Sequence, residues 1–325
     1  MFENIANLIN NYRNFVITSH VNPDGDSIGS EIALHTYLKN LGKNSRIINY
    51  SKTPDNYAFL DKNNIIEKFD ETEHKKVIEN TEVIFILDTN EYSRTRTMEP
   101  LLKNSKAVKV CIDHHPGPNK NGFDYYISDT ESPATGEILY SIFSESGNSI
   151  SPEIANALYT AIMTDTGSFR FPRTDHETHN ITAELIKAGA DPVKLYSEVY
   201  DKATIGRLKL LSLFLSNVKL VYDDRLIYGK LFLKDFEETN TNVFDTEGFS
   251  NYLMSIESVR LSLIFTEVQR GIKISFRSKG NIFVNDLARE FGGGGHMNAA
   301  GAFIVNGNMD TLTDEVLSKA KKYIL

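Results

Sequence analysis

Six residues of this chain have the types and the spacing that could hold divalent metal ions. The first three are His20, Asp24 and Asp26, which follow an apolar run and precede a helix-like segment. One imidazole and two carboxylates within seven residues suit a hard or borderline divalent cation. The alternative is an N-cap cluster, in which one of the aspartates or Ser27 only caps the helix that follows.

Two later apolar runs end in side chains of the same kind. Residues 83–87 lead into Asp88, and residues 107–112 lead into the Asp-His-His sequence at 113–115. Each run predicts a buried parallel strand. Since open α/β sheets bind ligands at the carboxyl ends of their strands, we expect these side chains to meet at one edge of one sheet. A further acid, Asp165, follows the apolar stretch of a helix that starts near Pro152.

The order of these groups resembles the DHH phosphoesterase superfamily: His-x-x-x-Asp-x-Asp, then Asp, then Asp-His-His, then Asp-Thr-Gly. Near the C-terminus, the sequence Gly-Gly-Gly-Gly-His-Met-Asn-Ala-Ala-Gly at 292–301 is similar to the signature of the DHH-associated domain. Together the two signatures span nearly the whole chain. Its compact length most resembles the bacterial nanoRNase/pAp-phosphatase branch and not the long single-strand exonuclease RecJ.

This resemblance implies a site with two divalent metal ions, usually manganese; the residue types alone leave zinc and magnesium open. One ion would be held by His20, Asp24 and Asp88, and the other by Asp26, Asp88, His114 and Asp165, so that Asp88 bridges them. His115 would face the phosphate, as a donor to the developing oxyanion or as the acid for the leaving oxygen. Asp113 would orient a histidine.

A second set of residues is predicted to bind the substrate. Arg94 matches an arginine that often follows the bridging aspartate in the family, although it also fits a solvated loop. Gly293, Gly294, Gly295 and His296 would form a binding loop with Arg277, because glycine lets backbone N–H groups approach a phosphate. For one or two of these glycines a structural turn is the alternative. No Gly-Lys-Ser/Thr follows, so this is not a Walker motif.

Composition limits the partners and the setting. The net charge of −8 argues against a broad basic surface for long nucleic acid, so an anionic substrate would be held locally. The single cysteine, Cys111, cannot form an internal disulfide, which fits a reducing cytoplasm. We expect neither secretion nor a membrane partner, because the N-terminus resembles no signal peptide and no apolar run is long enough to span a membrane.

The length of 325 residues and the alternation of elements predict two domains of the α/β class. We expect an N-terminal parallel-sheet domain over 1–188, a helical connector over 189–216, and a smaller α/β or α+β domain over 217–325. In the second domain we expect strands at 226–232, 259–265 and 272–276, and helices around 246–255, 284–291 and 309–324.

A motif that resembles a zinc protease signature is rejected. His176 and His179 are three residues apart, whereas the zincin motif needs histidines four apart. We interpret both as part of a solvated helix face.

The function that these features favour is a two-metal hydrolase of short RNA oligonucleotides, which releases mononucleotides and also removes the 3′-phosphate of 3′-phosphoadenosine 5′-phosphate. The alternatives are a phosphodiesterase for cyclic or linear dinucleotides and a nucleotide sensor without catalysis. Long duplex nucleic acid is not an expected partner. The oligomeric state stays open, with a homodimer as one alternative.

Overall fold

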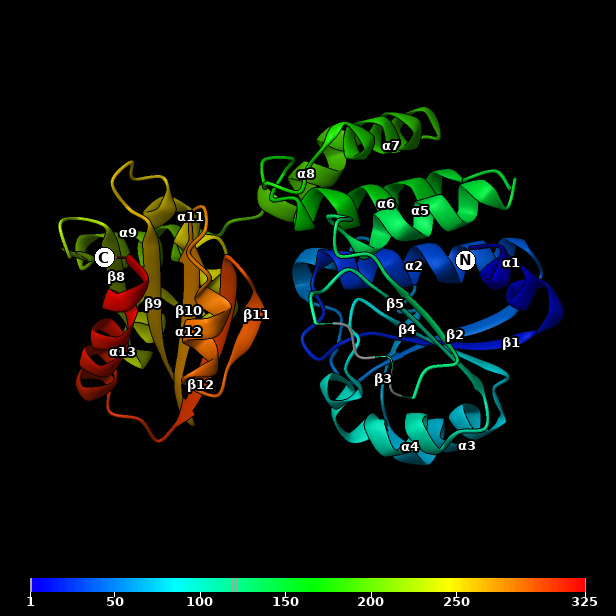
Figure 1. Cartoon of the computed structure of the whole chain (residues 1–325), viewed down its shortest axis with the longest axis horizontal. Coiled ribbons are helices and arrows are strands. Elements are labelled where there is room, and N and C mark those ends of the chain that lie inside the picture. Colours follow the sequence, from blue (N-terminus) through cyan, green and yellow to red (C-terminus); the bar gives the residue numbers. More distant parts are fainter. Residues whose placement is uncertain (1, 118–119, 121, 325) are drawn as a thin grey trace. The chain divides into compact units, whose positions relative to one another are not determined.

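The computed structural model describes residues 2–117, 120 and 122–324 of the chain (Figure 1). It separates into two compact units, of which unit 1 extends to Lys202 and unit 2 begins at Ala203. Each unit has its own buried core. Within the described ranges, no helix is both long and apolar enough to cross a membrane.

The segment expected to be a connector is divided between the two units. Its first helix, α8 (Pro192–Tyr200), lies in unit 1, and its second, α9 (Ile205–Ser216), lies in unit 2. The reason is the apolar face of each helix: Leu195 belongs to the core cluster of unit 1, and Phe214 to a core cluster of unit 2. Helical periodicity could not show which core each helix joins.

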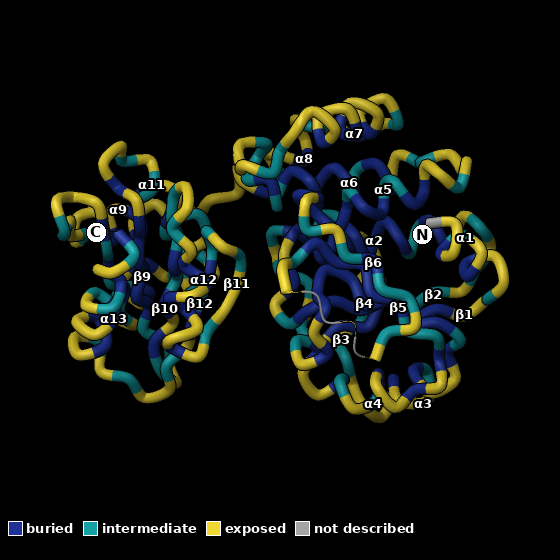
Figure 2. Tube along the Cα trace, viewed as in Figure 1, coloured by how far each residue is buried: buried dark blue, intermediate teal, exposed yellow. Residues whose placement is uncertain are grey.

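Unit 1 contains a six-stranded sheet in the order β3-β2-β1-β4-β5-β6, and every neighbouring pair is parallel. The strands are β1 Asn14–Thr18, β2 Asn44–Asn49, β3 Ile66–Lys68, β4 Val83–Leu87, β5 Val108–Asp113 and β6 Tyr125–Ser128. All five residues of β4 are buried, as expected for a central parallel strand that is covered on both faces (Figure 2).

The helices of unit 1 cover both faces of this sheet. They are α1 Phe2–Asn11, α2 Gly25–Asn40, α3 Glu71–Asn80, α4 Glu99–Asn104, α5 Thr135–Glu145, α6 Pro152–Asp165, α7 His176–Lys187 and α8, with a short 3-10 segment, η2 Tyr92–Met98. In Figure 1, α2, α5 and α6 lie on one side of the sheet, and α3 and α4 lie on the other. The parallel α/β organisation predicted for this half of the chain is confirmed.

Unit 2 is a smaller mixed sheet with helices on both faces. The strands are β7 Lys219–Val221, β8 Leu226–Leu231, β9 Leu261–Val268, β10 Gly271–Ser278, β11 Gly294–His296 and β12 Ala299–Val305, in the order β11-β12-β10-β9-β8-β7. Among the described strands of unit 2, only β8 and β9 pair in parallel. The helices are α9, α10 Leu233–Thr239, α11 Phe249–Met254, α12 Val284–Arg289 and α13 Met309–Ile324.

Candidate metal centre

The predicted metal ligands lie where the strand order of unit 1 reverses. The chain proceeds from β1 to one side of the sheet and returns at β4 to build the other side, so the carboxyl ends of β1 and β4 border a crevice. His20 lies two residues beyond β1, and Asp88 directly follows β4. Because β1 and β4 are hydrogen-bonded neighbours, the fold places these two side chains side by side.

The ring of His20 is oriented by backbone on one side and faces acids on the other. Its Nδ1 lies 2.9 Å from the carbonyl oxygen of Val21, which can only accept a hydrogen bond, so Nδ1 carries the proton. Its Nε2 lies 3.2 Å from Asp88 Oδ2 and 3.8 Å from Asp24 Oδ2. A histidine fixed through one nitrogen, with the other directed at carboxylates, has the geometry of a metal ligand.

His114 repeats this arrangement at the end of β5. Its Nδ1 lies 3.2 Å from the carbonyl oxygen of Ser132. Its Nε2 lies 3.3 Å from Asp165 Oδ2, and 3.6 Å from both Asp26 Oδ2 and Asp88 Oδ1. The ring therefore faces three carboxylates that arrive from α2, α6 and the end of β4.

Asp88 lies between the two groups of ligands. Its Oδ2 faces His20, whereas its Oδ1 faces His114. The hydroxyl of Ser27 donates to Oδ2 over 2.6 Å and that of Thr135 donates to Oδ1 over 3.3 Å. Each oxygen of Asp88 thus faces a different histidine, as a bridging carboxylate requires.

The charges of this cluster call for a cation. Burial raises the pKa of Asp26 well above its usual range, and the nearby charges of Asp88 and Asp165 raise it further. Burial and the charges of Asp24 and Asp88 likewise raise the pKa of Asp165. Burial lowers the pKa of His114. A bound divalent ion would relieve the repulsion among these carboxylates.

The pKa of Asp88 is displaced in the opposite direction. Burial alone would raise it, but the hydrogen bond with His20 and the charges of His115, His20 and His114 hold it well below its usual value. The partner, His20, has a raised pKa: burial lowers it, but the hydrogen bond with Asp88 and the charge of Asp24 outweigh that effect. Asp88 therefore ionises more readily than Asp26 or Asp165.

Helix ends position two of the acids. Asp24 is the N-cap of α2 and accepts a hydrogen bond from Ser27 N over 3.1 Å. Asp26 accepts from the first backbone amides of α5, Thr135 N at 2.7 Å and Gly136 N at 2.9 Å. The capping interpretation of this motif therefore holds for Asp24, and it coexists with the cluster of potential ligands.

Next to these ligands, three side chains form a chain of hydrogen bonds. His115 Nδ1 lies 2.8 Å from Asp113 Oδ1, and Asn90 Nδ2 donates to Asp113 Oδ2 over 2.8 Å. Asp113 is fully buried, whereas His115 is partly exposed. Asp113 thus holds the His115 ring in one orientation. Asn90, which donates this hydrogen bond to Asp113, belongs to no sequence motif that could have indicated its place in the site.

The donor set fits divalent metal ions. Within unit 1, three groups have ligand atoms that all lie within 4.8 Å of one another: His20 with Asp24 and Asp88, Asp26 with His114 and Asp165, and Asp88 with Asp113 and His115. Besides the bridging Asp88, the first two groups contain five aspartate or histidine residues, which come from the stretch 20–26 and from positions 114 and 165. Mixed imidazole and carboxylate ligands accommodate manganese, zinc or magnesium.

Of the predicted substrate-binding residues, Arg94 belongs to unit 1 and lies near these ligands. Arg94 is in η2, its carbonyl oxygen accepts from Val21 N over 2.8 Å, and its charge opposes the protonation of His20. Arg173, which the sequence did not indicate, also approaches: its Nη1 lies 3.5 Å from His114 O, and its charge favours the ionised form of Asp165. Neither arginine is fully buried.

The other predicted substrate residues lie in unit 2, and the glycine run differs from the expected loop. Gly294–His296 form the edge strand β11, which pairs with β12. A Cβ on Gly293 would lie 2.2 Å from Gly301 O, and one on Gly295 would lie 2.6 Å from Ala299 O. These two glycines permit close strand packing. A Cβ on Gly294 would meet no atom within 4 Å, so packing within unit 2 does not require this glycine.

Arg277 lies near the end of β10, opposite Ala299 of β12. Burial lowers its pKa, which the charge of Glu247 partly offsets. Lys273, which is exposed, lies on the same face of β10, four residues earlier. Two cations on one sheet face are suited to an anionic ligand.

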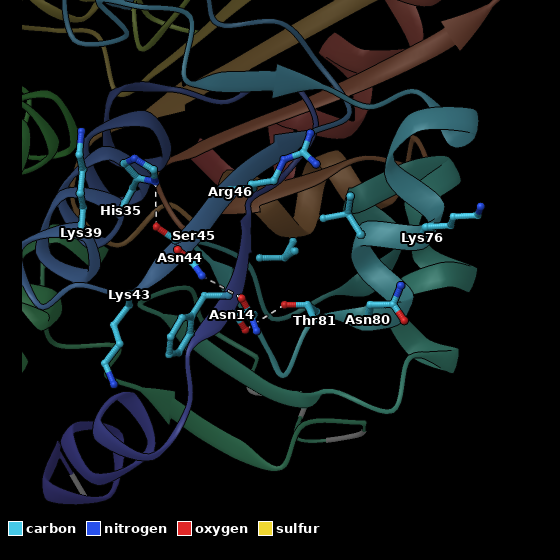
Figure 3. A pocket seen from close by; sticks show the side chains of 13 residues that line it. Asn14, His35, Lys39, Lys43, Asn44, Ser45, Arg46, Lys76, Asn80 and Thr81 are labelled. Carbon is cyan, nitrogen blue, oxygen red and sulfur yellow. Dashed lines mark hydrogen bonds between the residues drawn. The ribbon is translucent and has the colours of Figure 1, made fainter.

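A pocket of about 740 Å³ lies at the opposite edge of the unit 1 sheet, among Asn14, His35, Lys39, Arg46 and Lys76 (Figure 3). Cationic side chains line this pocket, but they do not make it a good anion site, because several of them already have partners of their own. Arg46 pairs with an acid of β3, and the His35 ring bonds the hydroxyl of the adjacent β2 residue over 2.9 Å. Helices α2 and α3 also point their negative ends toward this edge. We assign it no function.

Comparison with known proteins defines the class of this protein. The chain matches the DHH family, N-terminal domain, over residues 14–162, and the DHHA1 domain over residues 223–324. It belongs to the DHH phosphoesterase superfamily.

Two relatives cover nearly the whole chain, and both are bifunctional oligoribonucleases and PAP phosphatases of the NrnA type. That of Thermus thermophilus is 28% identical over 94% of this chain and 89% of its own length. That of Bacillus subtilis is 27% identical over 90% of each. The crystal structure of an exopolyphosphatase-related protein from Bacteroides fragilis is 32% identical, with a TM-score of 0.94 over 99% of this chain and 97% of that one.

Proposed function

We propose that this protein is a metal-dependent phosphoesterase that hydrolyses short RNA oligonucleotides to mononucleotides and also removes the 3′-phosphate of 3′-phosphoadenosine 5′-phosphate. The observation that carries the proposal is the position of Asp88, with one carboxylate oxygen toward His20 and the other toward His114. Near-full-length relatives named for the same two activities support it.

In this proposal, His20, Asp24 and Asp88 hold one divalent ion and Asp26, Asp88, His114 and Asp165 hold the other, with manganese as the ion expected. Two such ions, when bound, would neutralise the phosphoryl charge and lower the pKa of a bound water. The protein's part is to fix the ligands: backbone carbonyls orient both histidines, and the amino end of α5 holds Asp26.

His115 is the proposed acid for the leaving oxygen, or a donor to the developing oxyanion. Asp113 accepts from Nδ1, so Nε2 is the nitrogen that would exchange a proton with the substrate. Arg94 and Arg173 are proposed to contact phosphate oxygens beside the ligands. In unit 2, Arg277, Gly294 and His296 are proposed to recognise the nucleotide.

The test is a product time course on a labelled series of RNA lengths, with manganese, magnesium and chelator in parallel. We expect di- to pentanucleotides to be converted to mononucleotides and long strands to be poor substrates, because a chain of net charge −8 offers no extended basic track. Intact short substrates beside degraded long strands would overturn the proposal.

A dinucleotide phosphodiesterase is the alternative with the same chemistry, and matched rates on cyclic dinucleotides, linear dinucleotides and longer RNA distinguish the two. A sensor without catalysis is the alternative of another class. The hydrogen-bonded His115 and Asp113 favour an enzyme, because a sensor has no need of an oriented acid.

We also propose a cytoplasmic setting, since Cys111 is buried in β5 as a free thiol. Homodimer formation remains a proposal to be tested by sedimentation.

A further inference from the structure

Beneath the metal-binding edge of unit 1 lies a second layer of polar side chains. Thr18, Ser19, Glu31 and Asn49 are between 0% and 2% exposed. Burying polar groups costs free energy unless they are hydrogen-bonded, so four of them together need a structural or functional reason. No motif of the sequence indicates this layer.

Asn49 joins three elements through its side-chain amide. It is the last residue of β2, and its Oδ1 accepts from Ser19 N over 3.2 Å and from Thr18 Oγ1 over 3.3 Å, at the end of β1. Its Nδ2 donates to Oε2 of Glu31, in α2, over 2.8 Å. One amide group therefore ties the ends of two strands to the helix that follows the first.

The segment held in this way contains two of the six proposed metal ligands, His20 and Asp24. His20 directly follows Ser19, and the residues from 19 to 24 lie outside any helix or strand. Glu31 is one helical turn beyond Ser27, whose hydroxyl lies 2.6 Å from Asp88 Oδ2 and 2.9 Å from His20 Nε2. A shift of Asn49 would thus move the backbone that sets the position of the His20 ring.

We propose that Asn49 and Glu31 are positioning residues of the metal centre. Glu31 fixes the amide of Asn49, and that amide fixes the Ser19–His20 backbone, so that His20 Nε2 meets Asp24 and Asp88 without rearrangement. This inference rests on the metal centre proposed above. Hydrogen-bonded partners behind metal ligands typically change metal affinity by about 10- to 100-fold when they are removed.

The test is calorimetric titration of the full chain with Mn²⁺. Asn49→Ala should weaken binding by about 10- to 100-fold. Glu31→Gln should bind like the wild type, because the side-chain oxygen of glutamine still accepts from Asn49. Glu31→Ala should weaken binding, because it removes that acceptor. Asn285→Ala is the matched control: it removes a buried asparagine of unit 2 and should leave Mn²⁺ affinity unchanged.

Thermal unfolding with chelator shows whether each variant is folded. A folded Asn49→Ala variant with wild-type Mn²⁺ affinity would overturn the inference while leaving the metal centre intact. If Asn49→Ala does not fold, the two Glu31 variants provide the test. Equal Mn²⁺ affinities of Glu31→Gln and Glu31→Ala would overturn the inference. A loss of Mn²⁺ affinity in Glu31→Ala alone would support it. A wild type that binds no Mn²⁺ would overturn the metal centre and this inference together.

Discussion

At the residue scale, the backbone of Asp88 is as informative as its carboxylate. Its φ of 58° lies in the left-handed region, which asparagine and aspartate tolerate better than most other residues with a side chain. Asn is therefore a better test substitution than Ala, because it keeps both the shape and the local conformation. The change then removes the negative charge and replaces one acceptor oxygen with an amide N–H donor.

We expect Asp88→Asn to weaken Mn²⁺ binding by more than about 100-fold, beyond the effect typical of residues behind a ligand, and to abolish hydrolysis. Calorimetry and the RNA time course measure the two effects, and the circular dichroism spectrum with chelator checks the fold. Wild-type affinity in this variant would exclude Asp88 as a bridging ligand.

His115 is predicted to act on the substrate and not on the metal. We expect His115→Ala to lower kcat by about 100- to 10,000-fold, the range for loss of a general acid or base, with Mn²⁺ affinity unchanged. Single-turnover rates at saturating metal measure the chemical step. If Mn²⁺ affinity falls in parallel with the rate, His115 is a metal ligand. The 3.6 Å distance between His115 Nδ1 and Asp88 Oδ1 would accommodate that role.

Glu31 gives a prediction about stability. Burial raises its pKa from 4.5 to about 8, although the hydrogen bond from Asn49 opposes that shift. Between those two pH values the folded protein binds a proton that the unfolded chain has lost. The contribution of Glu31 to the free energy of unfolding therefore falls as pH rises, by about 1.4 kcal/mol for each unit of the shift.

Glu31→Gln removes this dependence and keeps the hydrogen bond. In chelator, we expect the melting temperature of the wild type to fall more between pH 5 and pH 9 than that of Glu31→Gln. Other buried carboxyls titrate in both proteins, so the difference between the two curves isolates Glu31. Parallel curves would contradict the raised pKa. The interval from pH 5 to pH 9 covers most of the range between the two pKa values of Glu31.

At the element scale, the glycine run of unit 2 separates into structural and functional positions. We expect Gly293→Ala to destabilise unit 2 by about 1–3 kcal/mol, because the new methyl group would meet the backbone of β12. We expect Gly294→Ala to leave the free energy of unfolding nearly unchanged and to raise KM for short RNA. Denaturant unfolding and steady-state kinetics measure these effects. A Gly294→Ala variant with unchanged KM would remove this glycine from the substrate site.

Helices and strands with a longer hydrophobic pattern were predicted more accurately than short ones. β4 and β5 were predicted close to their observed bounds, because each has a sustained apolar pattern. β3 and β11 have only three residues each, which is too short for a period to be read. β11 also consists mainly of glycine, which strands disfavour, so only its pairing with β12 defines it.

At the scale of the whole molecule, two units with separate cores should respond separately to metal. Mn²⁺ at about 100 times its dissociation constant should stabilise unit 1 by about 2.7 kcal/mol, a rise in melting temperature of roughly 5–10 °C. Calorimetric scans with Mn²⁺ and with chelator measure the shift. The transition of unit 2 should not move, and Asp88→Asn should abolish the shift of unit 1. Equal shifts of both transitions would contradict a centre built from unit 1 alone.

The sequence by itself determined the residue types, their order and the strands that deliver them, because these depend on local apolar patterns and turn residues. From these, the superfamily and the six proposed metal ligands could be named. Only the tertiary structure decided which oxygen of Asp88 faces which histidine, and that Asn49, Glu31 and Asn90 support the site. The contacts of Asn49, Glu31 and Asn90 join residues that are 18 to 30 positions apart in the chain, and no local pattern records them. They exist only because the parallel strands bring their carboxyl ends to one edge.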